Sequence, residues 1–130
     1  MRWLGWVVGL ALAGSAAAMP PVGTTFPERV FRLQPDTRRC MSPLCGGWWI
    51  TPVNTSRLVC PDGTRRTACY VASTEWADLG LDPVTSAALV QAAYLGDALV
   101  EGVVEIQSVA GYDLPVLRPT RGWWDVTFQP

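Results

Sequence analysis

The sequence predicts a mostly β domain of the α+β class, either a small antiparallel sheet or a five-stranded OB-like (oligonucleotide/oligosaccharide-binding) barrel. Three observations lead to this class. Apolar, β-branched segments occur three times before a single alanine-rich helical segment and two or three times after it. Four cysteines, an even number, suit two disulfides. The length of 130 residues is enough for one domain but not for two.

Three strands are expected in the first half of the chain. Residues Phe26–Gln34, Gly46–Asn54 and Cys69–Trp76 are rich in β-branched and aromatic side chains. Pro52 indicates that the second strand lies at a sheet edge or carries a bulge, because proline cannot donate a backbone hydrogen bond. The connection between the second and third strands is expected to turn at Asp62-Gly63, a pair that favours tight turns.

One helix is predicted between the third and fourth strands. Asp82 is a suitable N-cap, Pro83 fits the first helical position and Gly96 supplies a C-terminal stop. The alanine-rich run between these residues makes a helix of about three turns.

The second half of the sheet is predicted from alternation. In Asp97–Ser108, apolar and acidic residues alternate, which is typical of a half-buried strand, and Gly102 in its middle indicates a bulge or bend. Tyr112–Pro119 is expected to form a short extended piece. Gly122–Phe128 is expected to form the last strand, with Trp124, Val126 and Phe128 on its inner face.

The tryptophans are the candidate binding residues. Neighbours in a strand point to opposite faces, so one of Trp48 and Trp49 should face the core and the other should face outward. By the same alternation, Trp124 faces inward and Trp123 outward. Exposed indoles suit stacking on sugars or on side chains of a partner. We therefore expect a contact surface at Trp48 or Trp49 together with Trp123, with a protein or a polysaccharide as the partner.

The N-terminus has the layout of a secretory signal peptide. Arg2 precedes an apolar run, Trp3–Ala13, and the small residues Ala16–Ala18 form a cleavage site. The run is shorter than the ~20 residues that a transmembrane helix needs. We expect a secreted or periplasmic protein, cleaved near Ala18 and without membrane attachment afterwards. The expected organisation is a signal peptide (1–18), a flexible segment (19–25) and a single disulfide-braced domain (26–130).

Composition excludes several functions. The chain has ten arginines, no lysine and no histidine against eleven acidic residues, a formal charge of −1. Without the leader the balance is nine arginines against eleven acids, or −2. Nucleic-acid binding requires a basic surface and is not expected. Without histidine there is no base for a Ser-His-Asp triad, and without lysine no Ser-Lys pair. We expect a non-enzymatic domain with no catalytic residue and no cofactor.

The cysteines are expected to form disulfides, because exported small domains oxidise them. They are Cys40, Cys45, Cys60 and Cys69. Three connectivities are possible; we favour the local pairs because each encloses turn-forming residues, Ser-Pro in the first and Pro-Asp-Gly in the second. The spacings C-x4-C and C-x8-C do not match a zinc ribbon, so no metal is expected. Gly46 and Gly47 are expected to let the backbone pass close to the first disulfide.

Two alternative functions remain open. The Cys40–Cys45 loop could present Met41 rigidly to a protease, since a preorganised loop binds with a smaller ordering cost. Less favoured is a carboxylate-dependent hydrolase or a calcium site at Glu75, Asp78 and Asp82. Asp82 already has a role there as a helix cap.

The cysteine-rich segment also resembles a known family. Arg38–Ala72 resembles the recurring sequence motifs of an uncharacterised domain of exported bacterial proteins, notably from myxobacteria. The stretches that carry the resemblance are, in order, RRCMSPLCGGWW, PVN, CPDG and CYVA. VEGVVE, from Val100, is a weaker match to its next strand. The resemblance covers about a quarter of the chain. It implies an exported, disulfide-bearing domain of unknown function and assigns no catalytic residue.

Overall fold

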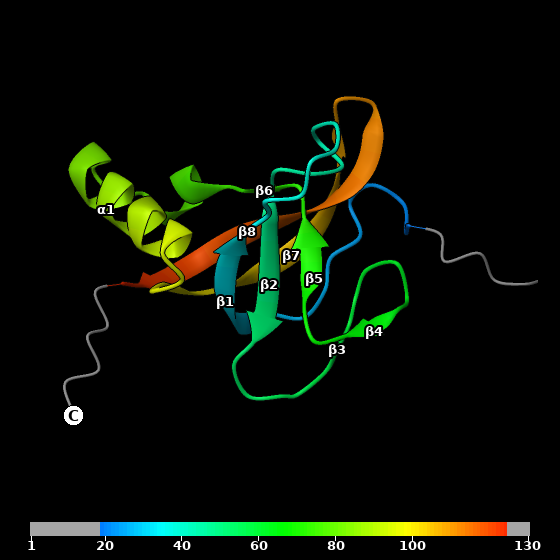
Figure 1. Cartoon of the computed structure of the whole chain (residues 1–130), viewed down its shortest axis with the longest axis horizontal. Helices are drawn as coiled ribbons and strands as arrows, with labels where there is room; N and C mark the ends of the chain where they lie inside the picture. Colours follow the sequence, from blue (N-terminus) through cyan, green and yellow to red (C-terminus); the bar gives the residue numbers. More distant parts are fainter. Residues whose placement is uncertain (1–18, 125–130) are drawn as a thin grey trace, which may run out of the picture.

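The computed structural model describes residues 19–124, which form a six-stranded sheet, a separate two-stranded hairpin and one α-helix (Figure 1). The elements in chain order are β1 (Arg29–Pro35), β2 (Trp48–Pro52), β3 (Leu58–Val59), β4 (Arg65–Arg66), β5 (Cys69–Val71), β6 (Ser73–Thr74), the 3-10 helix η1 (Trp76–Leu79), α1 (Pro83–Tyr94), β7 (Leu99–Val109) and β8 (Tyr112–Trp123). The mostly β class, the single helix within these residues and two disulfides are confirmed. The expected signal peptide, and Val126 and Phe128 of the expected last strand, lie outside the described residues.

Alternation along the strands separates an inner from an outer sheet face. Phe31 of β1 lies opposite Val100 of β7 and Pro52 of β2, and Leu33 lies opposite Ile50. Phe31, Leu33, Ile50 and Val100 are almost completely buried. The face that carries these side chains is called the inner face. It forms the core together with Leu89 of α1.

The helix begins and ends where the sequence predicts. The Asp82 carboxylate accepts hydrogen bonds from the Thr85 backbone N–H at 2.9 Å and from the Thr85 hydroxyl at 2.6 Å, and Pro83 occupies the first turn. At the other end, the Gly96 N–H donates to the Ala93 carbonyl at 3.1 Å. These caps satisfy backbone groups at both helix ends. Between them, Leu89 lies over Gly122 of β8.

The sheet is mixed, and its order is β5-β2-β1-β7-β8-β6. The expected single strand Cys69–Trp76 is therefore wrong, since the chain leaves β2 after Val71 and joins β8 from Ser73 onward. Ala72, between them, donates its N–H to the Pro115 carbonyl at 2.8 Å. Pairing of β6 with β8 is parallel, whereas the other pairs are antiparallel.

The crossing at Ala72 brings the two edges of the sheet close together without closing it. In the described part of the chain, the two edge strands, β5 and β6, do not pair with each other, so the sheet is not a closed barrel and the OB-like alternative is wrong. The physical reason is the shortness of β5 and β6, which have three and two residues. A closed barrel requires an edge ladder, and these strands are too short to continue one.

β7 and β8 form the longest strand pair, and together they confirm a predicted bulge. The register shifts between Glu101 and Gly102, where Gly102 lies opposite Pro119. A Cβ at Gly102 would lie 2.9 Å from the Pro119 Cα, so only glycine fits this close approach. The expected short piece Tyr112–Pro119 and the strand expected from Gly122 belong to one strand, β8, which ends at Trp123.

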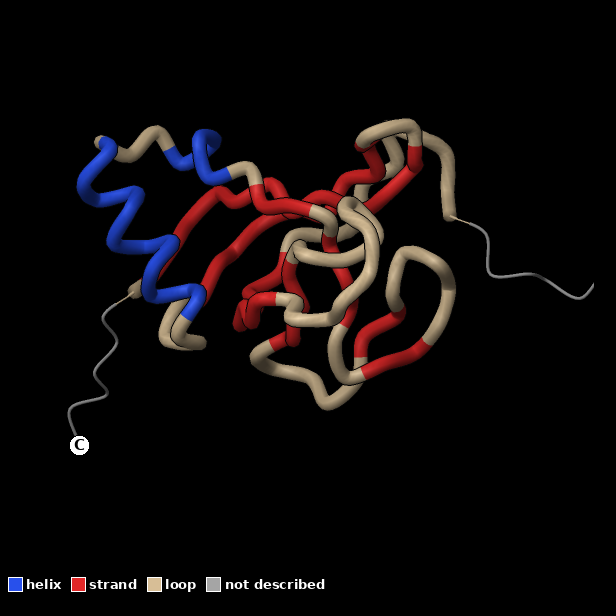
Figure 2. Tube along the Cα trace, turned by 45° about the horizontal axis from the view of Figure 1, so that its top comes forward, coloured by secondary structure: helices blue, strands red, loops and turns tan. Residues whose placement is uncertain are grey.

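The inner face is covered at one end by α1 and η1 and faces the β3–β4 hairpin at the other (Figure 1, Figure 2). The hairpin lies in a long connection, residues 53–68, which we call the arm. A disulfide between Cys60 and Cys69 joins the arm to the first residue of β5. The arm therefore stands beside the end of the sheet that the helix leaves uncovered.

The segment of residues 19–25 contacts β7. Gly23 donates its N–H to the Ile106 carbonyl at 2.8 Å, and the Ile106 N–H donates to the Thr24 carbonyl at 2.9 Å. Thr25 forms an isolated bridge with Glu105, and Phe26 donates its N–H to the Val104 carbonyl at 2.9 Å. These bonds place the Phe26 ring beside the inner face, where it packs against the core.

Candidate functional site

The three predicted binding tryptophans do not lie together. Trp48 is 6% exposed and packs edge-on against Trp76, with ring centroids 5.8 Å apart, so it offers no surface to a partner. Trp49 is half-buried on the outer face of β2. Trp123 is 40% exposed at the end of β8, and Trp124 packs against the core, as alternation predicts. Two strands, β1 and β7, separate β2 from β8, so Trp49 and Trp123 do not form one patch.

Both local disulfides form, Cys40–Cys45 and Cys60–Cys69. They engage all four cysteines of the chain, which leaves no thiol to bind zinc. The first closes a short loop that follows β1, and the second ties the arm to the sheet. Only the second disulfide therefore joins an irregular segment to a strand of the sheet.

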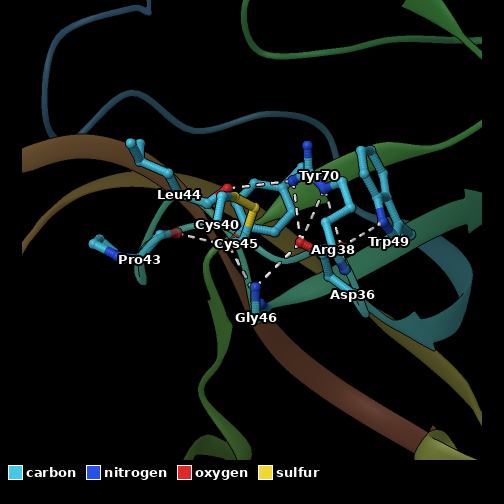
Figure 3. A network of polar contacts seen from close by, with 10 residues as sticks. Asp36, Arg38, Cys40, Pro43, Leu44, Cys45, Gly46, Trp49 and Tyr70 are labelled. Carbon is cyan, nitrogen blue, oxygen red and sulfur yellow. Dashed lines mark hydrogen bonds and ion pairs between the residues drawn. A yellow bond between two sulfur atoms is a disulfide. The ribbon is translucent and has the colours of Figure 1, made fainter.

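The first loop is held by an ion pair between the buried Asp36 and the half-exposed Arg38 (Figure 3). The Asp36 side chain is fully buried and accepts hydrogen bonds from Arg38 Nε and Nη2, both at 3.0 Å. It also accepts from the Arg38 and Gly46 backbone N–H groups, at 3.0 and 3.1 Å, and from Trp49 Nε1 at 3.3 Å. Hydrogen bonding to the Arg38 guanidinium lowers the pKa of Asp36 to about 2, despite the opposing effect of burial. Asp36 is thus ionised across the physiological range.

Two aromatic rings complete this arrangement. The Arg38 guanidinium lies over Trp49, 4.7 Å from the ring centroid, and over Tyr70, at 5.1 Å. The Tyr70 hydroxyl donates to the Pro43 carbonyl at 2.6 Å and accepts from the Gly47 N–H at 3.2 Å. Burial raises the pKa of Tyr70, which keeps the hydroxyl protonated for this role. We call the set Asp36, Arg38, Trp49 and Tyr70 the clamp.

The clamp is a structural device. The Asp36 carboxylate and the Tyr70 hydroxyl form hydrogen bonds with the Cys40–Cys45 loop and with neighbouring side chains. Neither group is left to act as a base or a nucleophile. Asp36, Arg38 and Tyr70 were not singled out as site residues from the sequence. The available signal was an aspartate directly after a strand and two residues before an arginine, a spacing at which aspartate accepts from the backbone.

Two of the three acidic residues considered for catalysis or calcium, Asp82 and Asp78, bind other partners. Asp82 caps α1, as described above. Asp78 Oδ2 accepts from Arg118 Nε at 2.9 Å, and Glu75 directly precedes η1. Within residues 19–124, no three His, Cys, Asp or Glu side chains gather to hold a metal ion.

A pocket of about 430 Å³ lies between the inner face and the arm, and we call it the arm pocket. Phe31, Ile50 and Val104 contribute from β1, β2 and β7, and Phe26 and Leu58 contribute from the N-terminal segment and the arm. The remaining lining residues are Pro27, Arg29, Thr55, Arg57, Val59, Pro61, Arg65 and Cys69. The apolar floor is therefore the part of the core that α1 does not cover.

Three arginines line the arm pocket: Arg29 on β1, and Arg57 and Arg65 on the arm. All three residues are exposed to solvent. The ion pairs of residues 19–124 involve only Arg38 and Arg118, so none of the three is neutralised by a carboxylate there. Sequence reasoning missed this pocket. Alternation does place Arg29 on the same face as Phe31, but the position of the arm is a long-range property.

Comparison with known proteins assigns the chain to a family. Across residues 19–124, no helix is both long and apolar enough to cross a membrane. No curated protein and no solved structure matches the chain. Residues 29–128 match the family model described as a domain of unknown function, DUF6748, which spans the clamp, both disulfides and most of the arm pocket. The expected membership of an uncharacterised domain family is confirmed: the chain belongs to the DUF6748 family.

Proposed function

We propose that this domain is an exported, non-enzymatic binding domain and that the arm pocket is its ligand site. The observation that carries the proposal is an open pocket of about 430 Å³ with an apolar floor, placed where the helix leaves the inner face uncovered. Volumes of about 300–1,000 Å³ are typical of small-molecule sites. The layout of residues 1–18 favours export, and two disulfides suit an oxidising compartment.

A disulfide holds one wall of the arm pocket, the arm, in place beside the sheet. The Cys60–Cys69 bond fixes the arm to β5, and the Cys60 N–H donates to the Thr64 carbonyl at 2.7 Å inside the arm. Asp62 adds bonds from the Thr64 N–H at 3.0 Å and from the Thr64 hydroxyl at 2.6 Å. A wall held in this way loses little freedom when a ligand binds, which favours affinity.

Binding to the arm pocket is tested with Nile red, a neutral apolar dye that fluoresces strongly out of water. We expect the oxidised protein to raise and blue-shift the dye fluorescence. Val59→Asp places a charge at the pocket wall and is expected to weaken dye affinity about tenfold, because an ionised carboxylate resists desolvation. Dye titration of each variant gives the comparison.

Val22→Asp is the matched control, since Val22 and Val59 are both 54% exposed and Val22 does not line the pocket. The control should bind the dye like the parent protein. Equal dye affinity in the two variants, or no dye binding at all, contradicts the proposal.

A second candidate is inhibition of a protease by the Cys40–Cys45 loop. Met41 is 82% exposed, and the clamp holds the loop by the Tyr70–Pro43 and Asp36–Gly46 bonds. Rigid presentation of an exposed side chain is what such an inhibitor needs. If a serine protease is inhibited, Met41→Asp should abolish the inhibition and Leu44→Asp, on the same loop, should weaken it less. An unchanged inhibition constant for Met41→Asp removes this candidate.

A further inference from the structure

We propose that the ligand of the arm pocket is a small amphipathic anion, an apolar chain or ring system that carries one carboxylate or phosphate head group. This inference rests on the proposed function, because it assumes that the pocket binds a ligand. It adds the chemical class of that ligand, which the apolar floor and the arginines of the pocket define together.

The arginines approach the pocket from two sides. Arg29 lies on β1, two residues before Phe31 and therefore on the same face of the strand. Arg57 directly precedes β3, and Arg65 lies in β4 opposite Val59. Guanidinium groups on both walls can converge on one head group, and each can donate two parallel hydrogen bonds to a carboxylate or a phosphate.

The positive charge is local to this pocket. The whole chain has a formal charge of −1, and no acidic residue is among the described residues that line the pocket. Nearby carboxylates are engaged elsewhere: Glu28 Oε1 accepts from the Thr120 hydroxyl at 2.8 Å, and Asp62 accepts from Thr64. An anionic head group would supply the counter-charge that the three arginines lack within residues 19–124.

The apolar lining requires an apolar portion in the same ligand. Phe26 and Leu58 are half-buried at the pocket, and Val59 is 54% exposed there. A purely inorganic anion would leave these side chains facing water, and an uncharged hydrocarbon would make no use of the arginines. A molecule with both parts removes apolar surface from water and pairs its charge at once.

The test compares three ligands with equal ten-carbon chains: decanoate and decyl phosphate below their micelle concentrations, and decanol below its solubility limit. Binding is measured by isothermal titration calorimetry at low and high salt. We expect at least one anion to bind about tenfold more tightly than decanol, a factor of ten being about 1.4 kcal/mol. High salt should reduce this preference, because exposed charges are screened. The tighter anion identifies the head group.

Variants test whether the charges of the pocket arginines cause the preference for an anion. Arg57→Gln/Arg65→Gln should remove most of the preference for the anion over decanol. Arg32→Gln is the matched control, since Arg32 is exposed on β1 but lies on the outer face. It should keep the preference.

Each contrary result has a distinct meaning. Equal affinity for decanol and for both anions overturns the inference and leaves the binding pocket in place. A preference that survives in Arg57→Gln/Arg65→Gln also overturns it. Absence of binding by all three ligands and by Nile red overturns the inference and the proposed function together.

Discussion

Replacement of Asp36 by asparagine is expected to lower the free energy of unfolding at neutral pH by about 3 kcal/mol, because it leaves a partly buried guanidinium without its counter-charge. The carboxylate gathers donors from Arg38, Gly46 and Trp49. An asparagine at this position keeps one acceptor oxygen and turns an amide donor toward groups that are themselves donors. Urea denaturation of oxidised protein, followed by tryptophan fluorescence, measures the loss.

The stability difference should also depend on pH in a defined direction. The pKa of Asp36 is about 2 in the folded protein, below its ordinary value of 3.8. A lowered folded-state pKa means that the unfolded chain binds the proton more readily, so stability falls as the pH is lowered through this window. We expect the parent protein to lose about 2 kcal/mol relative to Asp36→Asn between pH 5 and pH 2.

Asp62→Asn is the matched control for this prediction. Asp62 also accepts from the backbone N–H two residues along the chain, but its side-chain partner is the Thr64 hydroxyl and not a guanidinium. Its replacement should cost about 1 kcal/mol or less, since a neutral acceptor can serve both donors. If Asp36→Asn is no more destabilising than Asp62→Asn, the clamp does not have the structural role assigned to it.

The parts of the fold that could be predicted depend on neighbours in the sequence. Asp82, Pro83 and Gly96 specify the helix through contacts within one turn of each end. The alternation of β7 and the bulge at Gly102 are also local patterns. The disulfides pair cysteines only five and nine residues apart, so turn-forming residues between them were a sufficient guide.

The parts that were missed depend on which segments meet in space. Cys69–Trp76 has one continuous strand pattern, yet its partner changes from β2 to β8 at Ala72. Nothing in the local sequence specifies that change. The clamp also depends on long-range pairing. Asp36 and Arg38 are near neighbours in the sequence, but Tyr70 reaches the loop only because β5 pairs with β2. The arm pocket likewise exists only once the arm is placed beside the inner face.

Gly47 contacts both the clamp, through Tyr70, and the crossing at Ala72. Gly47→Ala is expected to lower the free energy of unfolding by about 3 kcal/mol. A Cβ at Gly47 would overlap the Val71 carbonyl oxygen and would lie 2.7 Å from the Ala72 carbonyl oxygen. Both obstacles are backbone atoms, so no side chain can rotate away. The close approach of Gly47 to the end of β5 was not predicted from the sequence.

The chain cannot relieve this overlap cheaply, because both sides of Gly47 are held. Its N–H donates to the Tyr70 hydroxyl, and its carbonyl accepts from the Asp36 N–H at 2.9 Å. On the other side, withdrawal of Ala72 would break its hydrogen bond to Pro115 and open the crossing between the two sheet edges.

Gly46→Ala provides the control in the adjacent residue. Gly46 has a φ of 88° and open space around its missing Cβ, so alanine there meets backbone strain but no obstacle. Its expected cost is about 1 kcal/mol. Urea denaturation of the two variants should therefore differ by about 2 kcal/mol. Equal stability of the two variants would mean that the backbone at Ala72 can move to make room for the added methyl group. The close packing at Gly47 would then not hold the two sheet edges together.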